Sequence, residues 1–264
     1  MRHAHADPAQ RGGAVTAHWP YPRVIAHRGG GGLAPENTLA AIRTGAQLGF
    51  AGVEFDVMLS RDSVPVLIHD ETLERTTNGT CAVANLPWAD LAAHDAGTWF
   101  GAAFAGEPLP RYEDAARLCV DLGLWANVEI KPAAGFERET GHVVAATSAA
   151  LWRAAPVAPL LSSFSTGALE AAAAAAPRLT RGLLVEAIPD DWRDAVVRLG
   201  CVSLHCSFRH LTKAQARAVR DTGCALLCYT VNDPATAKEL VAWGVDAVIA
   251  DRLDLVLPEL GVAA

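Results

Sequence analysis

The sequence predicts an α/β protein of the TIM-barrel type, in which eight parallel strands form a closed ring surrounded by helices. Three observations support this fold class. After residue 22, short apolar runs of strand length alternate with stretches whose apolar residues recur at helical spacing. Glycine, which commonly ends a helix, follows most of the helical stretches. The length of 264 residues is also usual for one such barrel.

Nine strands are expected. In chain order they are "RVIAHR" (23–28), "GVEFDVMLS" (52–60), "VPVLIH" (64–69), "WANVEIK" (125–131), "APLLSSF" (158–164), "RGLLVE" (181–186), "CVSLHC" (201–206), "ALLCYTV" (225–231) and "DAVIAD" (246–251). Each is a short, largely apolar run, and several also carry polar residues in alternation, as strands do.

Seven helices are expected between the strands, at 37–49, 113–123, 138–153, 166–176, 190–199, 212–222 and 234–243. Glycine lies at or just past the end of five of them, as Gly49, Gly123, Gly200, Gly223 and Gly244. Repeated strand–helix units give a parallel sheet. Their number and their short connections favour a closed barrel over an open, doubly wound sheet.

One segment interrupts this alternation. Residues 71–110 are rich in turn residues and contain only a weak helical patch, so we expect a small insertion after an early barrel strand. Residues 1–22, which include His3, His5 and His18, are expected to form a flexible tail rather than a metal site. The remaining residues, 23–264, are expected to form a single catalytic domain.

Composition limits the partners that the protein can have. A net charge of −7 without any Lys/Arg run argues against nucleic-acid binding, so the expected partner is a small molecule. The six cysteines show no CxxC spacing and are expected to be reduced and structural. The first residues lack the apolar run of a secretion signal, and no apolar run is long enough to span a membrane. These features predict a cytoplasmic protein.

Charged residues gather at the ends of the first four predicted strands. They are His27 and Arg28, Glu54 and Asp56, His69 and Asp70, and Glu129 and Lys131. Residues two apart on a strand share a face, so each carboxylate or carboxylate–lysine pair points to one side. Because the carboxyl ends of parallel barrel strands meet at one rim, which carries the active site, we expect these side chains to converge.

The three carboxylates Glu54, Asp56 and Glu129 form an all-oxygen set that suits a hard divalent cation rather than zinc. Taken alone, Glu54 and Asp56 would fit the solvent face of an edge strand. A buried carboxylate cluster without a cation would be unfavourable by several kcal/mol per ion, so a metal or a basic partner is expected. Mg²⁺ is the first expectation, with Ca²⁺ or Mn²⁺ as alternatives.

The basic residues complete the predicted site. His27 and His69 could be structural, but on strands that converge at a metal site they are suited to acid–base catalysis. Lys131 could be a surface lysine, yet the chain has only three lysines and this one follows a carboxylate strand. Arg28 and the backbone of the four glycines 29–32 are expected to bind phosphate.

The helix after these glycines has recognisable start signals. Pro35 fixes the entry of the chain, and either Asn37 or Thr38 is expected to cap the first turn. No GK[ST] follows the glycines, so a nucleotide-binding P-loop is not supported.

Six stretches, in this order, resemble one enzyme family. They are "AHRGGGGLAPENTLAAI", "GVEFDVMLSRDSVPVLIHDETLERTTNG", "VEIKP", "SSFS", "LCYTVNDP" and "GVDAVIADR". The resemblance extends over residues 23 to about 256. The set resembles the glycerophosphodiester phosphodiesterases, in particular their cytoplasmic bacterial branch. The resemblance implies a TIM barrel with an insertion at 71–110 and metal-dependent hydrolysis of glycerophosphodiesters to glycerol 3-phosphate and an alcohol.

The resemblance also implies roles for individual residues. It makes His27 and His69 the catalytic histidines, Glu54, Asp56 and Glu129 the metal ligands, and Arg28 and Lys131 the phosphate-binding residues. Two positions depart from the family pattern. Tyr229 stands where many members carry Trp, at the position that packs on the glycerol moiety, and Leu253 stands where a proline is usual.

Several alternatives stay open at the level of sequence. The nucleophile can be water or the substrate's own 2-hydroxyl, and either histidine can be the acid. Tyr229, Phe164, Trp99 and His205 are candidates for the pocket wall, and each could equally be packing. Lys131 at a strand end would also fit a Schiff-base aldolase, and a catalytically silent barrel could bind glycerophosphoryl ligands.

Overall fold

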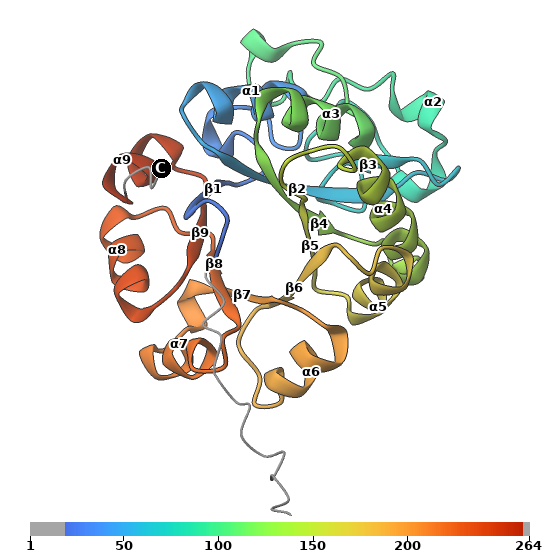
Figure 1. Ribbon diagram of the computed structural model, residues 1–264. Coiled ribbons are helices and arrows are strands. Elements are labelled where there is room, and N and C mark those ends of the chain that lie inside the picture. Colours follow the sequence, from blue (N-terminus) through green and yellow to red (C-terminus); the bar gives the residue numbers. More distant parts are fainter. Residues whose placement is uncertain (1–18, 261–264) are drawn as a thin grey trace, which may run out of the picture.

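The computed structural model describes residues 19–260, which form one closed barrel with helices around it (Figure 1). The strands are β1 (Val24–Ala26), β2 (Gly52–Leu59), β3 (Pro65–Leu67), β4 (Trp125–Ile130), β5 (Leu160–Ser163), β6 (Thr180–Val185), β7 (Ser203–Ser207), β8 (Ala225–Tyr229) and β9 (Ala247–Ala250). They follow the order β1-β9-β8-β7-β6-β5-β4-β2-β3, and a further pairing of β1 with β2 closes the ring. The predicted TIM barrel is confirmed.

The helices lie outside this ring. They are α1 (Leu39–Gln47), α2 (Trp88–Leu91), α3 (Tyr112–Leu122), α4 (Glu137–Leu151), α5 (Thr166–Ala175), α6 (Trp192–Leu199), α7 (Lys213–Arg220), α8 (Pro234–Trp243) and α9 (Leu253–Leu260). Gly123, Gly200 and Gly244 end helices α3, α6 and α8 in the left-handed conformation, as their positions predict. Helix α9, which contains Pro258, was not predicted from the sequence. None of the helices in residues 19–260 has the length and apolarity needed to cross a bilayer.

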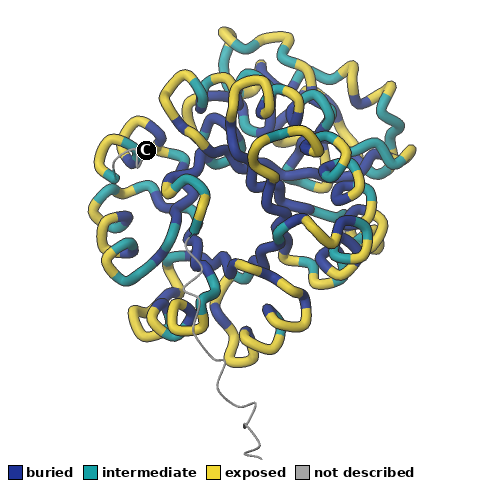
Figure 2. The backbone as a smooth tube through the Cα atoms, viewed as in Figure 1, coloured by how far each residue is buried: buried dark blue, intermediate teal, exposed yellow. Residues whose placement is uncertain are grey.

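The barrel strands are buried on both faces, which Figure 2 shows as a dark ring inside partly exposed helices. Val53, Phe55 and Val57 of β2 face outward and belong to the large core under the helices. The intervening residues Glu54 and Asp56 therefore face the inside of the barrel, because side chains alternate along a strand. This alternation delivers the two carboxylates to the barrel interior.

The third strand does not run as predicted. We expected all strands to be parallel, but β3 pairs antiparallel with β2 and lies outside the eight-strand ring. His69 therefore does not lie at the carboxyl end of a barrel strand. The antiparallel return instead carries the chain back along β2, and the backbone N–H of Ile68 donates to the carbonyl of Asp56. His69 is thereby placed beside the carboxylates by a different route.

The segment 71–110 forms an ordered addition on one side of the barrel, seen with α2 and β3 at the upper right of Figure 1. It contains α2 and two short 3-10 helices, at Val83–Asn85 and Ala102–Phe104. Its residues Leu73, Val83 and Leu91 pack with Met58 and Ile68 into a separate small core. This core fixes the insertion beside β3.

The prediction of a flexible tail over residues 1–22 is wrong for residues 19–22. Tyr21 stacks on Trp125 with ring centroids 4.5 Å apart, and Trp19 meets the same indole edge-on at 5.8 Å. The apolar residues at the amino ends of several strands, Ile25 among them, pack in the same cluster. Residues 19–22 thus cover one end of the barrel, whereas residues 1–18, with His3, His5 and His18, lie outside the described residues.

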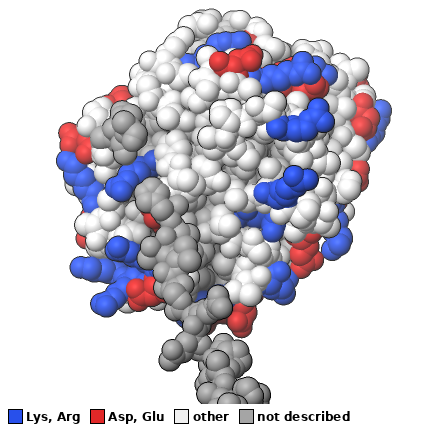
Figure 3. Space-filling view, in the orientation of Figure 1, with Lys and Arg blue, Asp and Glu red and all other residues white. Residues whose placement is uncertain are grey.

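Charged side chains of both signs surround the face of the molecule drawn in Figure 3. Lys and Arg alternate with Asp and Glu toward its periphery, and the described residues form no continuous basic track on this face. The prediction that the protein does not bind nucleic acid rests on the overall charge of −7 and remains a prediction. All six cysteines are free thiols, and four of them are buried.

Candidate active site

A pocket of about 240 Å³ opens among the polar residues at the carboxyl ends of the strands. All eight residues that the sequence analysis assigned to the site line it: His27, Arg28, Glu54, Asp56, His69, Glu129, Lys131 and Tyr229. Three strands and the turn after β3 supply the charged groups, which are far apart in the sequence. The barrel therefore brings the predicted residues into a single pocket.

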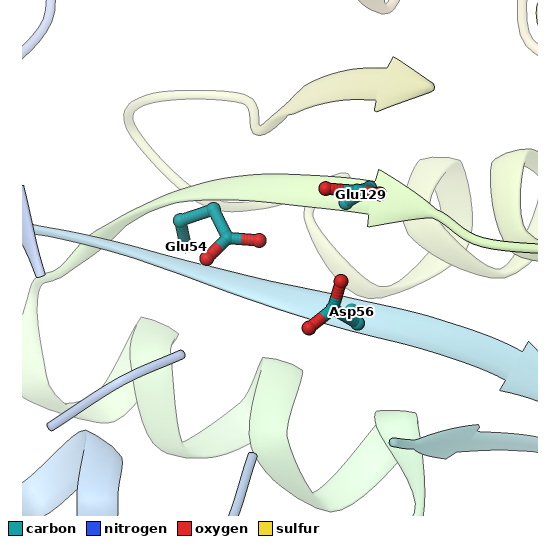
Figure 4. Close-up of side chains that lie close together, drawn as sticks. All are labelled: Glu54, Asp56 and Glu129. Atoms are coloured by element: carbon teal, nitrogen blue, oxygen red, sulfur yellow. The ribbon is translucent and has the colours of Figure 1, made fainter. Parts of the chain in front are cut away.

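The three carboxylates form a tight cluster on adjacent strands (Figure 4). One oxygen from each of Glu54, Asp56 and Glu129 lies within 4.8 Å of the other two, and all three side chains are buried. Asp56 on β2 is directly opposite Glu129 on β4 in the strand register. Three converging oxygen ligands on rigid strands are the arrangement that a hard divalent cation requires.

The electrostatics of this cluster are unbalanced without a cation. Burial has the largest effect on Glu54 and Glu129, and repulsion from Asp56 has the next largest. Together they raise the pKa of Glu54 well above its ordinary value and the pKa of Glu129 to about 7. Burial also acts against ionisation of Asp56, but Lys131 and Arg28 outweigh it and lower its pKa. The nearby bases thus favour the ionised form of Asp56, while burial and repulsion between the carboxylates disfavour ionisation of Glu54 and Glu129. The donor set therefore fits a divalent ion.

Two cationic side chains border the carboxylates. The ammonium of Lys131 lies 3.3 Å from Glu129 and 3.6 Å from Asp56. The Nε of Arg28 lies 3.7 Å from Asp56, and its backbone N–H donates to Glu54 at 3.0 Å. Arg28 has φ of +51°, an uncommon value for a residue with a side chain. Both cations therefore line the same pocket and lie near the same carboxylate, that of Asp56.

Each histidine is held between an aspartate and a cation. The Nδ1 of His27 lies 2.6 Å from Asp251, and Arg28 Nε donates to its Nε2 at 3.3 Å. The Nδ1 of His69 lies 2.6 Å from Asp70, and Lys131 donates to its Nε2 at 2.9 Å. Because the cations can only donate, each Nε2 must be the acceptor, and each Nδ1 must carry the proton that the aspartate accepts.

This tautomer places the basic nitrogen of both rings toward the pocket. Burial, the largest influence, lowers the pKa of His69, and Arg28 adds to this effect. His69 is therefore a neutral imidazole near neutral pH. The two imidazole rings, each oriented by a carboxylate, provide groups suited to proton transfer in one pocket.

The chain matches the model of the glycerophosphoryl diester phosphodiesterase family over residues 27–255, a span that contains every residue lining the pocket. The chain belongs to this family. Glycerophosphodiester phosphodiesterase is thus its enzyme class.

Named relatives and solved structures agree with this membership. The glycerophosphodiester phosphodiesterase of Caldanaerobacter subterraneus subsp. tengcongensis is 33% identical, with 86% of this chain and 93% of that protein aligned. The Bacillus subtilis glycerophosphodiester phosphodiesterase is 28% identical over 88% of this chain and 84% of its own length. An Oleispira antarctica phosphodiesterase, solved with its product sn-glycerol 3-phosphate, superposes with a TM-score of 0.86 at 37% identity, covering 91% of this chain and 97% of that one.

Several residues that position the side chains of the phosphodiesterase site were not assigned to this site from the sequence. Asn37 donates its amide N–H to Asp56 at 2.9 Å and accepts the backbone N–H of Asp56 at 3.0 Å. Of the two predicted helix caps, Thr38 is therefore the one that caps α1, since it accepts the N–H of Ala41. Asn232 likewise donates its amide N–H to the carboxylate of Asp251 and accepts the backbone N–H of Asp251.

The signal for these residues is present in the sequence, but it is weak. Asn37, Asn232 and Asp251 lie in the stretches "PENT", "TVNDP" and "IADR". Their roles depend on partners up to 224 residues away, as for His27 and Asp251, so the local pattern does not reveal them.

A chain of ion pairs connects the two histidine sides of the site. Arg28 donates to Glu36 at 2.5 Å, and Arg75 donates to the same carboxylate at 2.7 and 2.9 Å. Arg75 also binds both oxygens of Asp70, and its hydrogen bond holds the pKa of Asp70 well below its usual range. Arg75 therefore fixes the carboxylate that orients His69.

Replacing this arginine tests the chain of ion pairs. Arg75→Gln is expected to lower kcat roughly tenfold, because Asp70 and Glu36 lose their shared partner and the His69 ring loses its fixed orientation. Arg75→Lys should recover only part of the loss, since an ammonium cannot form both forks. Arg117→Gln, which removes an exposed pair with Glu113 on α3, is the matched control. Equal kcat values for the Arg75 and Arg117 variants would rule out this positioning role.

For three of the four glycines, the structure contradicts the expected role of the backbone in binding phosphate. The backbone N–H groups of Gly29, Gly31 and Gly32 donate to carbonyls of Glu54, His27 and Asp251 and are not free for a ligand. A Cβ added to Gly31 would lie 2.3 Å from the carbonyl oxygen of Asp251. The glycines instead allow the turn after β1 to pack tightly against the residue that holds His27.

Two neighbouring glycines give a matched test of this packing. Gly31→Ala is expected to lower the free energy of unfolding by about 2 kcal/mol or more, because φ is +56° and the new Cβ meets the Asp251 backbone. Gly32→Ala, whose Cβ would meet its nearest atom only at 3.8 Å, should change it by less than about 1 kcal/mol. Urea unfolding checks both variants, and a similar loss for the two would contradict the packing argument.

Of the four candidates for the pocket wall, two lie in the pocket and two do not. Phe164 and Tyr229 line it, with ring centroids 6.0 Å apart in an edge-on arrangement. Trp99 lies in the insertion, and His205 lies inside the barrel with its Nε2 bonded to Ser203, so neither is a wall residue. Burial lowers the pKa of His205 to about 3, which makes it a neutral, internal group.

Proposed function

We propose that this phosphodiesterase hydrolyses glycerophosphodiesters, such as glycerophosphocholine or glycerophosphoethanolamine, to sn-glycerol 3-phosphate and an alcohol in the cytoplasm. The observation that carries the proposal is the joint placement of two aspartate-oriented histidines, two cations and three carboxylates around one pocket. A phosphodiester needs all three kinds of group, because it is an anion whose cleavage moves two protons.

Glu54, Asp56 and Glu129 would hold one divalent cation, with Mg²⁺ as the first candidate and Ca²⁺ or Mn²⁺ as alternatives. When bound, such an ion would supply positive charge that stabilises the anionic phosphodiester. The raised pKa values of Glu54 and Glu129 support this assignment, since a cation would stabilise their ionised forms.

The remaining charged residues bind and stabilise the phosphate. Arg28 offers its guanidinium and Lys131 its ammonium to the non-bridging oxygens, and both are adjacent to the carboxylate cluster. Electrostatic stabilisation of the developing charge should supply the largest part of the rate enhancement. When these cations bind phosphate, the Nε2 atoms of His27 and His69 that they contact become available for proton transfer.

The two histidines then divide the proton transfers. One takes a proton from the nucleophile, either water or the 2-hydroxyl of the substrate, and the other gives a proton to the leaving alkoxide. Asp251 and Asp70 stabilise whichever ring is charged. Tyr229 is proposed to pack against the glycerol moiety. Its hydroxyl donates a hydrogen bond to the backbone carbonyl of Val185.

A Schiff-base aldolase fits the site less well. Burial favours the neutral amine of Lys131, but the carboxylates of Glu129 and Asp56 outweigh it and raise the lysine pKa. A lysine kept charged is a poor nucleophile. Three clustered carboxylates would also have no task in that chemistry.

The test is an assay of glycerol 3-phosphate release from glycerophosphocholine and glycerophosphoethanolamine. The protein is first treated with EDTA, and Mg²⁺, Ca²⁺ and Mn²⁺ are then restored separately. Turnover with a restored metal supports the proposal. A folded protein that binds the diester with every metal but does not cleave it would favour a binding module instead.

A further inference from the structure

Several buried polar atoms on the barrel strands have no hydrogen-bond partner. Among the described residues, five buried side-chain atoms lack a hydrogen-bond partner: Nε1 of Trp125, Nδ2 and Oδ1 of Asn127, Oγ of Ser162 and Nδ1 of His205. A buried polar group without a partner is unfavourable by about 1–3 kcal/mol. Such a group in a pocket is therefore a place where a ligand or water supplies the missing hydrogen bonds.

Asn127 differs from the other residues of this set because it alone among them lines the described pocket. It is 1% exposed and is held on β4 directly opposite Glu54. It also lies two residues before Glu129, on the same inward face of the strand. Both polar atoms of its amide are thus unpartnered at the floor of the pocket, next to two of the three carboxylates.

The chemistry of an amide selects the kind of group that it can bind. Asn127 offers an N–H donor and a carbonyl acceptor from one rigid position, and a hydroxyl can accept from the first and donate to the second. A phosphate dianion would satisfy the donor but repel the carbonyl oxygen. Leu184 and Ile249, which line the same pocket, offer no competing polar group.

We propose that Asn127 binds a hydroxyl of the substrate's glycerol moiety and makes the enzyme select glycerophosphoryl compounds over phosphoesters that lack this hydroxyl. The inference rests on the proposed function. The other unpartnered atoms of the set belong to residues that do not line the pocket. This difference makes Ser162, which is also buried and unpartnered, the matched control.

Binding of the proposed product, sn-glycerol 3-phosphate, tests this selection. The test does not depend on the identity of the nucleophile. Calorimetry with the metal-loaded protein measures Kd for sn-glycerol 3-phosphate, for its two monodeoxy analogues (3-hydroxypropyl and 2-hydroxypropyl phosphate) and for inorganic phosphate. The wild-type protein is expected to bind glycerol 3-phosphate roughly tenfold or more tightly than at least one analogue.

The variants then assign this preference to a residue. Asn127→Leu should abolish the preference and leave the Kd for inorganic phosphate within about twofold of the wild-type value, while Ser162→Ala should keep the preference. Asn127→Ala is measured as well, in case the leucine variant does not fold, and thermal unfolding monitors all three.

Two results would overturn the inference while leaving the proposed function intact. One is equal wild-type affinity for glycerol 3-phosphate and both analogues, and the other is a preference that survives in the folded Asn127 variant. A wild-type protein that binds neither inorganic phosphate nor any of the monoesters would overturn the proposed function, and this inference with it.

Discussion

Chelation of divalent cations is expected to lower kcat by roughly a thousandfold or more, because the cation contributes several kcal/mol of charge stabilisation in the transition state. Glu54→Gln should produce a loss of similar size even at saturating Mg²⁺. This variant removes one of the three converging oxygen charges and leaves the strand and its burial unchanged. The release of glycerol 3-phosphate over a range of metal concentrations measures both effects.

Metal binding should also be visible without turnover. A cation that binds the folded chain raises the melting temperature by an amount that grows with the ratio of its concentration to its Kd. We therefore expect Mg²⁺, Ca²⁺ or Mn²⁺ to raise the melting temperature of the chelated wild-type protein and to have a much smaller effect on Glu54→Gln. Glu170→Gln, which changes an exposed carboxylate paired with Arg138 and Arg198, is the control and should behave as wild type. Full activity after exhaustive chelation would refute the metal assignment.

Replacement of either histidine has the second large expected effect. His27→Ala and His69→Ala are each expected to lower kcat by roughly 100- to 10,000-fold, since each removes one of two proton-transfer groups. The KM should change much less, because Arg28 and Lys131 still bind the phosphate. Steady-state kinetics on glycerophosphocholine separates the two parameters.

The aspartates that orient these rings give a graded comparison. Asp251→Asn should lower kcat by a smaller factor than His27→Ala, because the ring remains but loses the carboxylate that fixes its tautomer. His142→Ala removes an exposed histidine on α4 and is the control. If His27→Ala and His142→Ala retained the same kcat, the proposed acid–base role of His27 would have to be abandoned.

Most of the fold was readable from the sequence because its elements follow local rules. The alternation in "GVEFDVML" places Val53, Phe55 and Val57 on one face and the two carboxylates on the other, and the structure has this arrangement. Helix ends at Gly123, Gly200 and Gly244 were similarly predictable, since a left-handed residue is easiest for glycine. These features depend on neighbours within a few residues.

Two of the three errors occur where the determining contact is distant in the sequence, whereas the direction of β3 depends on its pairing with the neighbouring strand β2. The sequence "VPVLIH" indicates a strand but not its direction, so β3 was placed in the parallel ring although it pairs back on β2. The glycines 29–32 indicate close approach, but only the packed structure identifies the Asp251 backbone, and not a phosphate, as the approaching group. The aromatic residues at positions 19 and 21 gave no local signal that they cover the barrel.

The sequence by itself determined the barrel class and eight of the residues that line the pocket. For the residues on the parallel strands, strand periodicity sets which side chains face inward, and these strands end at one rim. The tertiary structure decided the orientation, tautomer and charge of those residues. The contacts of Asp251 with His27, of Asn37 with Asp56 and of Arg75 with Asp70 fix tautomers and charges. The contact between Asp251 and His27 depends on the pairing of β9 with β1, which brings groups 224 residues apart within hydrogen-bonding distance.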